Sequence, residues 1–388
     1  MSRVLRLSLC AALITFGFGA PTAARTAPRG DAQLAGTVTA VAFDARLSAA
    51  ATIDAAVAAQ STIATLIGQK LVVRMEGLTP SASLLGRIQR GEVGGVILFG
   101  SNITTPAALR TLTATLRGAA AAGGRPPLLI AVDQEGGAVK RIPWIPPTLS
   151  PPQMGQLAST SVARAQGSAT GAALRDLGID VDFAPVADVP ASTASFMYLT
   201  GRTWSFNASR TAWLSNAFAT GLRGQAVAPT MKHFPGIGYA TKNTDASVVT
   251  IWASRTELSP GLAPYRMAIA THLPLIMLSN ATYPAYDSAH AAGWSPAIVG
   301  TLLRQDLGFT GVTITDSLDG TASARGITTR RLAAAAARAG TDMILTTGSE
   351  AGTSGVFAYL VQQATGGAIP MATLQASYAR ILAMKASL

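Results

Sequence analysis

The chain has 388 residues, of which 49% are hydrophobic, 13% are charged and 6% are aromatic. A chain this apolar can bury a large core, so the composition excludes an intrinsically disordered protein. The formal net charge is +11, but the basic residues are scattered, with Lys140-Arg141 and Arg330-Arg331 as the tightest pairs, and they form no stripe or arm, which argues against nucleic acid as a partner.

The first 24 residues have the pattern of a secretory signal peptide. Arg3 and Arg6 precede an apolar run over 7–20, and small residues follow at 21–24. The run has about 14 residues and a membrane-spanning helix needs about 20, so we expect export and cleavage, not membrane insertion. Cys10 is the one cysteine and lies in this run, so the exported chain would hold no disulfide bond.

Residues 25–60 are rich in alanine and threonine without a firm periodicity, which indicates a partly disordered leader before a helix near 61–69. After it, eight short apolar runs alternate with longer segments of helical period, as is typical of parallel βα units. Eight such units predict a single α/β domain over 61–388, a TIM-type (β/α)8 barrel. The runs cover 70–77, 94–100, 127–137, 180–189, 226–236, 274–284, 311–318 and 340–348.

Several of these runs end in ionisable or hydrogen-bonding side chains. Because the carboxyl ends of parallel strands converge on one rim of a barrel, we expect these side chains to line one cup. A single Asp there could be a turn or capping residue, but five strands together favour a functional site. The side chains concerned are Asp133, Gln134, Glu135, Asp188, Lys232, His233, Ser279, Asn280 and Asp316.

Three of these strand ends lie in longer motifs, VDQEGG (132–137), MKHFPGIG (231–238) and VTITDSLDG (312–320). In this order they resemble the catalytic domain of glycoside hydrolase family 3, and most closely its single-domain bacterial β-N-acetylglucosaminidases. The resemblance extends from about residue 60 to the end of the chain. It implies an exo-acting, retaining glycosidase of the β-N-acetylhexosaminidase or β-glucosidase type that removes a terminal β-linked sugar, with cell-wall glycan fragments as one substrate source.

The resemblance also implies roles for individual residues. Asp316 matches the position of the family's nucleophile, although a helix N-cap is the alternative. Five further residues match positions that bind sugar hydroxyls, namely Asp133, Arg141, Arg202, Lys232 and His233. His233 has the alternative role of bracing its loop. We expect the segment Glu135-Gly136-Gly137 to be structural, with its glycines allowing a tight turn under the sugar ring, and Asp319 to be a solvated turn residue.

The chain departs from the family in the loop that carries the general acid/base. The family pattern resembles KHFPGHGxxxxDSH, with a catalytic Asp-His dyad, whereas this chain has KHFPGIGYATKNTDAS. Aligned without gaps, residues 243–245 stand where Asp-Ser-His is expected; with a two-residue insertion, 245–247 take that place. Both alignments leave Asp245 as the candidate acid/base, since a buried carboxylic acid near a second carboxylate can act as a proton donor. The alternative is a solvated loop aspartate.

Two classes of function therefore remain open. The first is a secreted glycosidase that uses Asp316 and Asp245, with phosphorolysis as an enzymatic variant. The second is a glycan-binding barrel that has lost hydrolysis together with the dyad histidine. The sequence indicates no metal site and no cofactor, because the exported chain lacks cysteine, its histidines are not at ligand spacing, and no nucleotide-binding motif follows a strand. The identity of the sugar, its linkage and the oligomeric state stay open.

Overall fold

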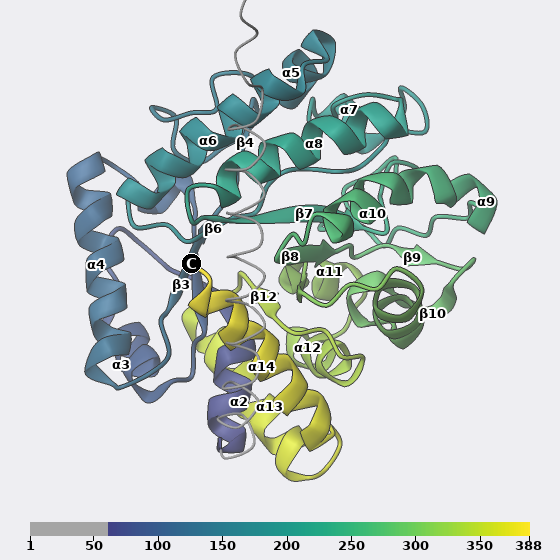
Figure 1. Ribbon diagram of the computed structural model, residues 1–388. Helices are drawn as coiled ribbons and strands as arrows, with labels where there is room; N and C mark the ends of the chain where they lie inside the picture. The colour runs from purple at the N-terminus through teal and green to yellow at the C-terminus, as the bar shows by residue number, and fades with distance from the viewer. Residues whose placement is uncertain (1–60) are drawn as a thin grey trace, which may run out of the picture. The chain divides into compact units, whose positions relative to one another are not determined.

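A computed structural model describes residues 61–388, so the predicted signal peptide (1–24) and leader (25–60) lie outside the described residues. Eight parallel strands form one sheet inside a ring of helices (Figure 1). These strands are β1 (Leu71–Arg74), β2 (Gly95–Leu98), β3 (Leu129–Val132), β6 (Val181–Asp182), β7 (Ala228–Phe234), β8 (Leu275–Leu278), β11 (Val312–Thr315) and β12 (Ile344–Thr346). Each of the eight apolar runs contains one of them.

The sheet closes on itself. Its order is β11-β8-β7-β6-β3-β2-β1-β12, and every neighbouring pair is parallel. Its two ends meet at Met343, whose amide donates to the Thr313 carbonyl (2.8 Å) and whose carbonyl accepts from the Thr315 amide (3.1 Å). The predicted (β/α)8 barrel is therefore confirmed.

Helices follow the strands and cover the outside of the sheet. They are α2 (Ile63–Lys70), α3 (Ala82–Arg90), α4 (Pro106–Ala122), α5 (Pro151–Leu157), α6 (Thr160–Asp176), α7 (Phe196–Leu199), α8 (Ala208–Arg223), α9 (Arg255–Leu258), α10 (Ala263–Ala270), the π-helix η4 (Ala297–Asp306), α11 (Leu318–Ala324), α12 (Thr329–Arg338), α13 (Glu350–Thr365) and α14 (Met371–Ala386). Short 3-10 turns are η1 (Gly100–Asn102), η2 (Ser259–Leu262) and η3 (Ala292–Trp294). Among these helices, none is long and apolar enough to cross a membrane.

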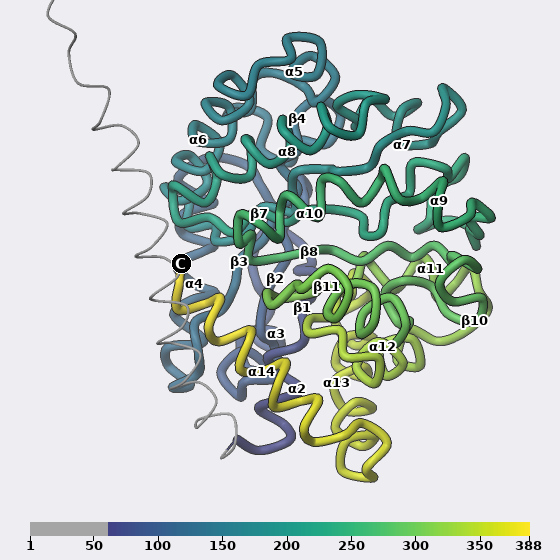
Figure 2. Tube along the Cα trace, turned by 45° about the vertical axis from the view of Figure 1, so that its right-hand side comes forward, coloured from purple at the N-terminus to yellow at the C-terminus, as the bar shows by residue number. Residues whose placement is uncertain are grey.

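Local sequence explains where several helices begin. The hydroxyl of Thr105 accepts from the Ala108 amide at 3.2 Å, and Pro106 fits the first position of α4, where an amide would have no partner. The hydroxyl of Ser295 accepts from the Ile298 amide at 3.1 Å. Helix α2 packs against α13 and α14, so the first and last described helices lie side by side and complete the ring (Figure 2).

The barrel interior is packed with hydrocarbon, and its polar residues lie above this layer. The interior side chains alternate along the strands, as the two-residue period of a strand requires, and they include Val72, Ile97, Leu129, Val181, Phe183, Leu275, Val312 and Leu345. A second shell of apolar residues fills the space between strands and helices. The hairpins β4 (Gln134–Gly136)–β5 (Val139–Lys140) and β9 (Thr282–Tyr283)–β10 (Asp287–Ala291) follow β3 and β8 at the carboxyl ends, where the interior opens.

Candidate active site

One pocket of about 170 Å³ opens at the carboxyl ends of the strands. All seven residues that the sequence singled out as catalytic or sugar-binding contribute to its lining: Asp133, Arg141, Arg202, Lys232, His233, Asp245 and Asp316. Glu135, Asn243, Thr244 and Ser317 line it as well. Side chains from the end of β7 and from the segments that follow β3, β6, β7 and β11 therefore meet in one cup, as expected for this kind of barrel.

A buried ion-pair network forms one wall of the pocket. Lys232 Nζ lies 2.8 Å from Asp133 Oδ1 and 2.6 Å from Glu135 Oε1. Arg202 donates two hydrogen bonds to the same glutamate, from Nε to Oε2 (2.8 Å) and from Nη2 to Oε1 (2.7 Å). Burial by itself would raise the pKa of Glu135, but the charges of Lys232 and Arg202 hold this pKa down at about 2. Glu135 is therefore a fixed anion that orients both cations.

Glu135 was expected at the rim, in a structural segment whose glycines allow a tight turn, but its role as the partner of two cations was not predicted. The turn itself is present, since Gly136 and Gly137 have φ values of +91° and +61° that favour glycine. The Glu135 side chain, however, is buried between two cations that follow it by 67 and 97 residues in the chain. A buried strand-end carboxylate that needs a cationic partner was the available signal.

Arg141 approaches the same wall from the outside. Its backbone amide donates to the Asp133 carbonyl at 3.2 Å, and its Nη2 lies 3.8 Å from Asp133 Oδ2. The guanidinium stands over the Phe99 ring, 5.5 Å from the ring centroid. Its Nε is buried and has no hydrogen-bond partner within 61–388, and the residue lines the pocket.

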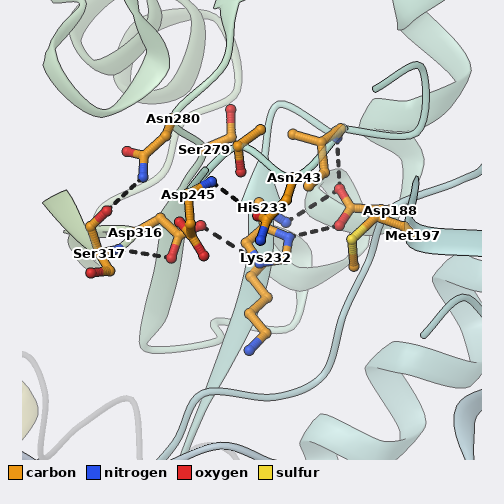
Figure 3. Close-up of polar contacts among 12 residues, drawn as sticks. Asp188, Met197, Lys232, His233, Asn243, Asp245, Ser279, Asn280, Asp316 and Ser317 are labelled. Carbon is orange, nitrogen blue, oxygen red and sulfur yellow. Dashed lines mark hydrogen bonds and ion pairs between the residues drawn. The ribbon is translucent and has the colours of Figure 1, made fainter. Parts of the chain in front are cut away.

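His233 and Asp188 form a buried dyad on the second wall (Figure 3). His233 Nδ1 lies 2.7 Å from Asp188 Oδ2, and Asp188 Oδ1 accepts from the Ile237 amide at 2.7 Å. The carboxylate fixes the orientation of the imidazole, so that Nε2 faces Asp316 Oδ2 at 3.9 Å. Asp188 braces the turn after β7, while His233 points into the pocket.

Asp316 follows β11 directly and faces His233 across the cup. Its amide donates to the Leu278 carbonyl at 2.9 Å, and its Oδ1 accepts from the Ser317 amide at 2.8 Å. Helix α11 begins at Leu318 with Ser317 as the cap position, so Asp316 does not bond the second or third helical amide as an N-cap would. The carboxylate is 15% exposed and reaches the pocket.

Asp245 lies beside Asp316 on the loop after β7 (Figure 3). Its Oδ1 is buried and has no hydrogen-bond partner among the described residues. Burial raises the pKa of Asp245 to about 7, and the nearby charge of Asp316 contributes in the same direction. The carboxyl is therefore not that of a solvated loop aspartate, and near neutral pH it can hold or release a proton.

Asp319 was expected to be a solvated turn residue, and this was wrong. Its Oδ1 accepts from the Thr329 hydroxyl at 3.0 Å, and its Oδ2 accepts from the Thr347 amide at 2.5 Å. Asp319 thus ties α11 to the end of β12. Elsewhere, no group of three or more His, Cys, Asp or Glu side chains within 61–388 is arranged to hold a metal ion.

A family model agrees with this architecture. The model of the glycosyl hydrolase family 3 N terminal domain matches residues 62–384. The chain belongs to glycosyl hydrolase family 3. The resemblance drawn from the three sequence motifs is therefore confirmed.

Individual relatives are consistent with this assignment. An uncharacterized secreted glycosyl hydrolase of Arthroderma benhamiae is 35% identical over 335 residues, covering 84% of this chain and 94% of that protein. A beta-hexosaminidase of Nitrosomonas eutropha is 33% identical over 259 residues, covering 64% of this chain and 72% of that protein.

Solved structures of similar proteins, one of them named as a glycoside hydrolase family 3 enzyme, have the same fold. A β-N-acetylhexosaminidase from Beutenbergia cavernae superposes with a TM-score of 0.78 at 29% identity, covering 84% of this chain and 99% of that one. A β-N-acetylglucosaminidase from a Paenibacillus species gives a TM-score of 0.80 at 29% identity. The match covers 84% of this chain but only 62% of that longer protein.

Proposed function

We propose that this family 3 protein is an exported, retaining β-N-acetylhexosaminidase in which Asp316 is the nucleophile and Asp245 is the general acid/base. The observation that carries the proposal is the pair of carboxyl groups in one pocket, of which Asp245 has its pKa raised to about 7. A retaining glycosidase needs this division, with one carboxylate ionised for attack and one carboxylic acid able to donate a proton.

In the first step, an Asp316 oxygen forms a bond to the anomeric carbon while the bond from that carbon to the leaving oxygen breaks. Protonated Asp245 gives its proton to the leaving oxygen, so the aglycone departs as a neutral alcohol. The product is a glycosyl ester on Asp316 and a carboxylate on Asp245. His233 Nε2 lies 3.9 Å from Asp316 Oδ2 and helps to position the nucleophile beside the sugar ring.

In the second step, Asp245 acts as the base. Its carboxylate takes a proton from water while the water oxygen attacks the anomeric carbon and displaces Asp316. The sugar leaves with the configuration that it had in the substrate. Asp133, Arg141, Arg202, Lys232 and His233 bind the hydroxyls of the sugar, and Glu135 keeps the two cations among them in place.

The proposed substrate is a terminal β-linked N-acetylhexosamine, as in cell-wall glycan fragments. This choice rests on the named activities of the family 3 relatives and solved neighbours. We also propose that 1–24 is cleaved as a signal peptide and that 25–60 is a leader before the barrel, which would place the enzyme outside the cytoplasm.

The test begins with purified protein and a panel of 4-nitrophenyl β-glycosides of N-acetylglucosamine, glucose and xylose. Release of nitrophenol from the N-acetylglucosaminide supports the proposal, and Asp316→Asn is expected to abolish it. Azide then separates the two roles, because a small anion can replace a missing carboxylate. Asp245→Ala with azide is expected to form a β-glycosyl azide, whereas Asp316→Ala is expected to form the α-glycosyl azide.

Two other outcomes would contradict this function. Sugar binding by calorimetry without turnover of any glycoside would favour the glycan-binding barrel. Turnover that requires inorganic phosphate and yields a sugar 1-phosphate would favour phosphorolysis, in which phosphate replaces water as the acceptor.

A further inference from the structure

We propose that helix α11 positions the acid/base by docking the loop 241–248 through two residues, Gly320 and Thr321. The inference rests on the proposed role of Asp245 and extends it to residues outside the pocket lining. Helix α11 starts two residues after Asp316. One short helix would therefore set the position of the acid/base loop relative to the nucleophile.

Thr321 provides the hydrogen bond that holds the loop. Its hydroxyl donates to the Thr244 carbonyl at 2.7 Å, and both residues are buried. The two other hydrogen bonds of the loop backbone are internal, from the amides of Asp245 and Ala246 to Asn243. Within the described residues, the Thr321 bond is thus the one hydrogen bond from another element to the backbone of 241–248.

Gly320 makes room for the loop at the next position along the helix. A Cβ atom at residue 320 would lie 2.2 Å from the Asp245 carbonyl oxygen and 3.1 Å from its carbonyl carbon. Backbone atoms cannot yield as a flexible side-chain end can, so any larger residue must push the Asp245 backbone away. Only glycine lets the loop approach α11 this closely.

The helix itself is anchored to the barrel, which makes it a rigid support. Asp319 accepts from the Thr347 amide, and the hydroxyls of Ser317 and Thr347 lie 2.6 Å apart. Asn280, at the end of β8, donates from Nδ2 to the Ser317 carbonyl at 2.8 Å. The start of α11 is therefore held by the ends of β8 and β12, the two strands that flank β11, so the helix is expected to stay in place when the loop moves.

A displaced loop would change catalysis in a recognisable way. The carboxyl of Asp245 faces Asp316, His233, Arg202 and the Asn280 amide. If the loop moves outward, Asp245 loses both burial and proximity to Asp316, so its pKa falls toward that of an ordinary aspartate. Proton donation to the leaving oxygen then weakens, because acid catalysis requires hydrogen-bond reach.

The experiment compares Thr321→Val, which removes the hydroxyl at nearly constant size, with Thr321→Ser, which keeps it. Ser323→Ala removes an exposed hydroxyl on the same helix and is the matched control. Gly320→Ala tests the close approach independently. For each variant, kcat/KM is measured with a poor and a good leaving group, such as methyl and 2,4-dinitrophenyl N-acetylglucosaminides, together with the pH profile and thermal unfolding.

For Thr321→Val and Gly320→Ala we expect kcat/KM with the poor leaving group to fall about tenfold to a hundredfold, with less than a threefold change for the good one. The basic limb of the pH profile should move to lower pH. Thr321→Ser and Ser323→Ala should stay close to the parent. Equal losses with both leaving groups, or an unmoved pH limb in a folded variant, would overturn the docking role.

Asp245→Ala is measured in parallel. If it shows no dependence on the leaving group, the proposed acid/base role of Asp245 fails. If it shows this dependence while Thr321→Val and Gly320→Ala both behave as the parent does, the inference about α11 fails and the proposed function stands.

Discussion

Lys232 Nζ lies 2.6 Å from Glu135 Oε1, and both side chains are buried at the mouth of the barrel. A buried ion pair is costly to break from one side, because the remaining charge loses its partner and cannot be solvated. Arg202 shares the same carboxylate, so Glu135 compensates two cations. This arrangement leads to the first prediction.

Replacing Glu135 with Gln removes the charge and leaves Lys232 and Arg202 with one fewer anion. We expect Glu135→Gln to lower the free energy of unfolding by about 3 kcal/mol. Urea denaturation followed by circular dichroism measures this loss. The exposed Glu76→Gln is the control: Glu76 Oε1 accepts from the Glu350 amide at 3.1 Å, a bond that glutamine can also make, so the change in stability should stay below about 1 kcal/mol. Equal stability of the two variants would show that the network does not depend on Glu135.

The second prediction concerns the pH dependence of activity. Burial and the charge of Asp316 raise the pKa of Asp245 to about 7, so the acid form that donates the proton is lost as the pH rises through this value. We expect kcat/KM for the N-acetylglucosaminide to fall above about pH 7. A profile that stays flat to pH 9 would argue against Asp245 as the acid.

The third prediction concerns stability and a different carboxyl group. Asp182 is fully buried, and its Oδ1 accepts from the Gln134 backbone amide at 2.9 Å. Burial raises the pKa of Asp182 from 3.8 to about 8. Between pH 3.8 and about pH 8, Asp182 binds a proton in the folded state but not in the unfolded state. The stability that this proton contributes is therefore complete below about pH 4 and is lost as the pH rises toward 8.

Asp182→Asn should remove this pH dependence, because the side-chain amide of asparagine carries no charge and its oxygen can still accept from the Gln134 backbone amide. The melting temperature of the variant relative to the parent should therefore increase steadily from pH 5 to pH 8. Asp176→Asn, at an exposed position, serves as the control and should show a constant difference. A constant difference for Asp182→Asn as well would mean that the group is ionised in the folded protein.

The fourth prediction tests the His233–Asp188 dyad. Asp188 fixes the imidazole through a 2.7 Å contact and also holds the turn through the Ile237 amide. Asp188→Asn keeps the shape but weakens both bonds, because a neutral amide oxygen is a poorer acceptor than a carboxylate. We expect kcat/KM to fall about tenfold to a hundredfold, by analogy with the loss of groups that orient other catalytic side chains. Steady-state kinetics with the N-acetylglucosaminide checks this, and an unchanged value would show that His233 needs no orientation by Asp188.

The barrel could be predicted from the sequence because each strand and each helix is indicated by residues that lie close together in the chain. Eight apolar runs mark the strands, the polar ends of five of them mark the rim, and residues at those ends, such as Asp133 and Asp316, reach the pocket by strand geometry alone. The motif order then identified the family.

The remaining features depend on partners that are distant in the chain. Asp319 has the local sequence of a turn, but its partner is the Thr347 amide, 28 residues later. The environment of Asp245 is set by α11, where Thr321 lies 77 residues from its acceptor Thr244. No pattern within the loop indicates this contact, so whether Asp245 is buried or solvated could not be inferred from the sequence.

The most direct test of the central claim is to trap the covalent intermediate. The protein is incubated with a 5-fluoro N-acetylglucosaminyl fluoride, whose glycosyl ester is hydrolysed slowly, and is then analysed by intact-mass spectrometry and peptide mapping. The account predicts one added sugar, attached to Asp316. Attachment to another residue, or rapid turnover of a good substrate with inversion of configuration and no trapped adduct, would contradict it.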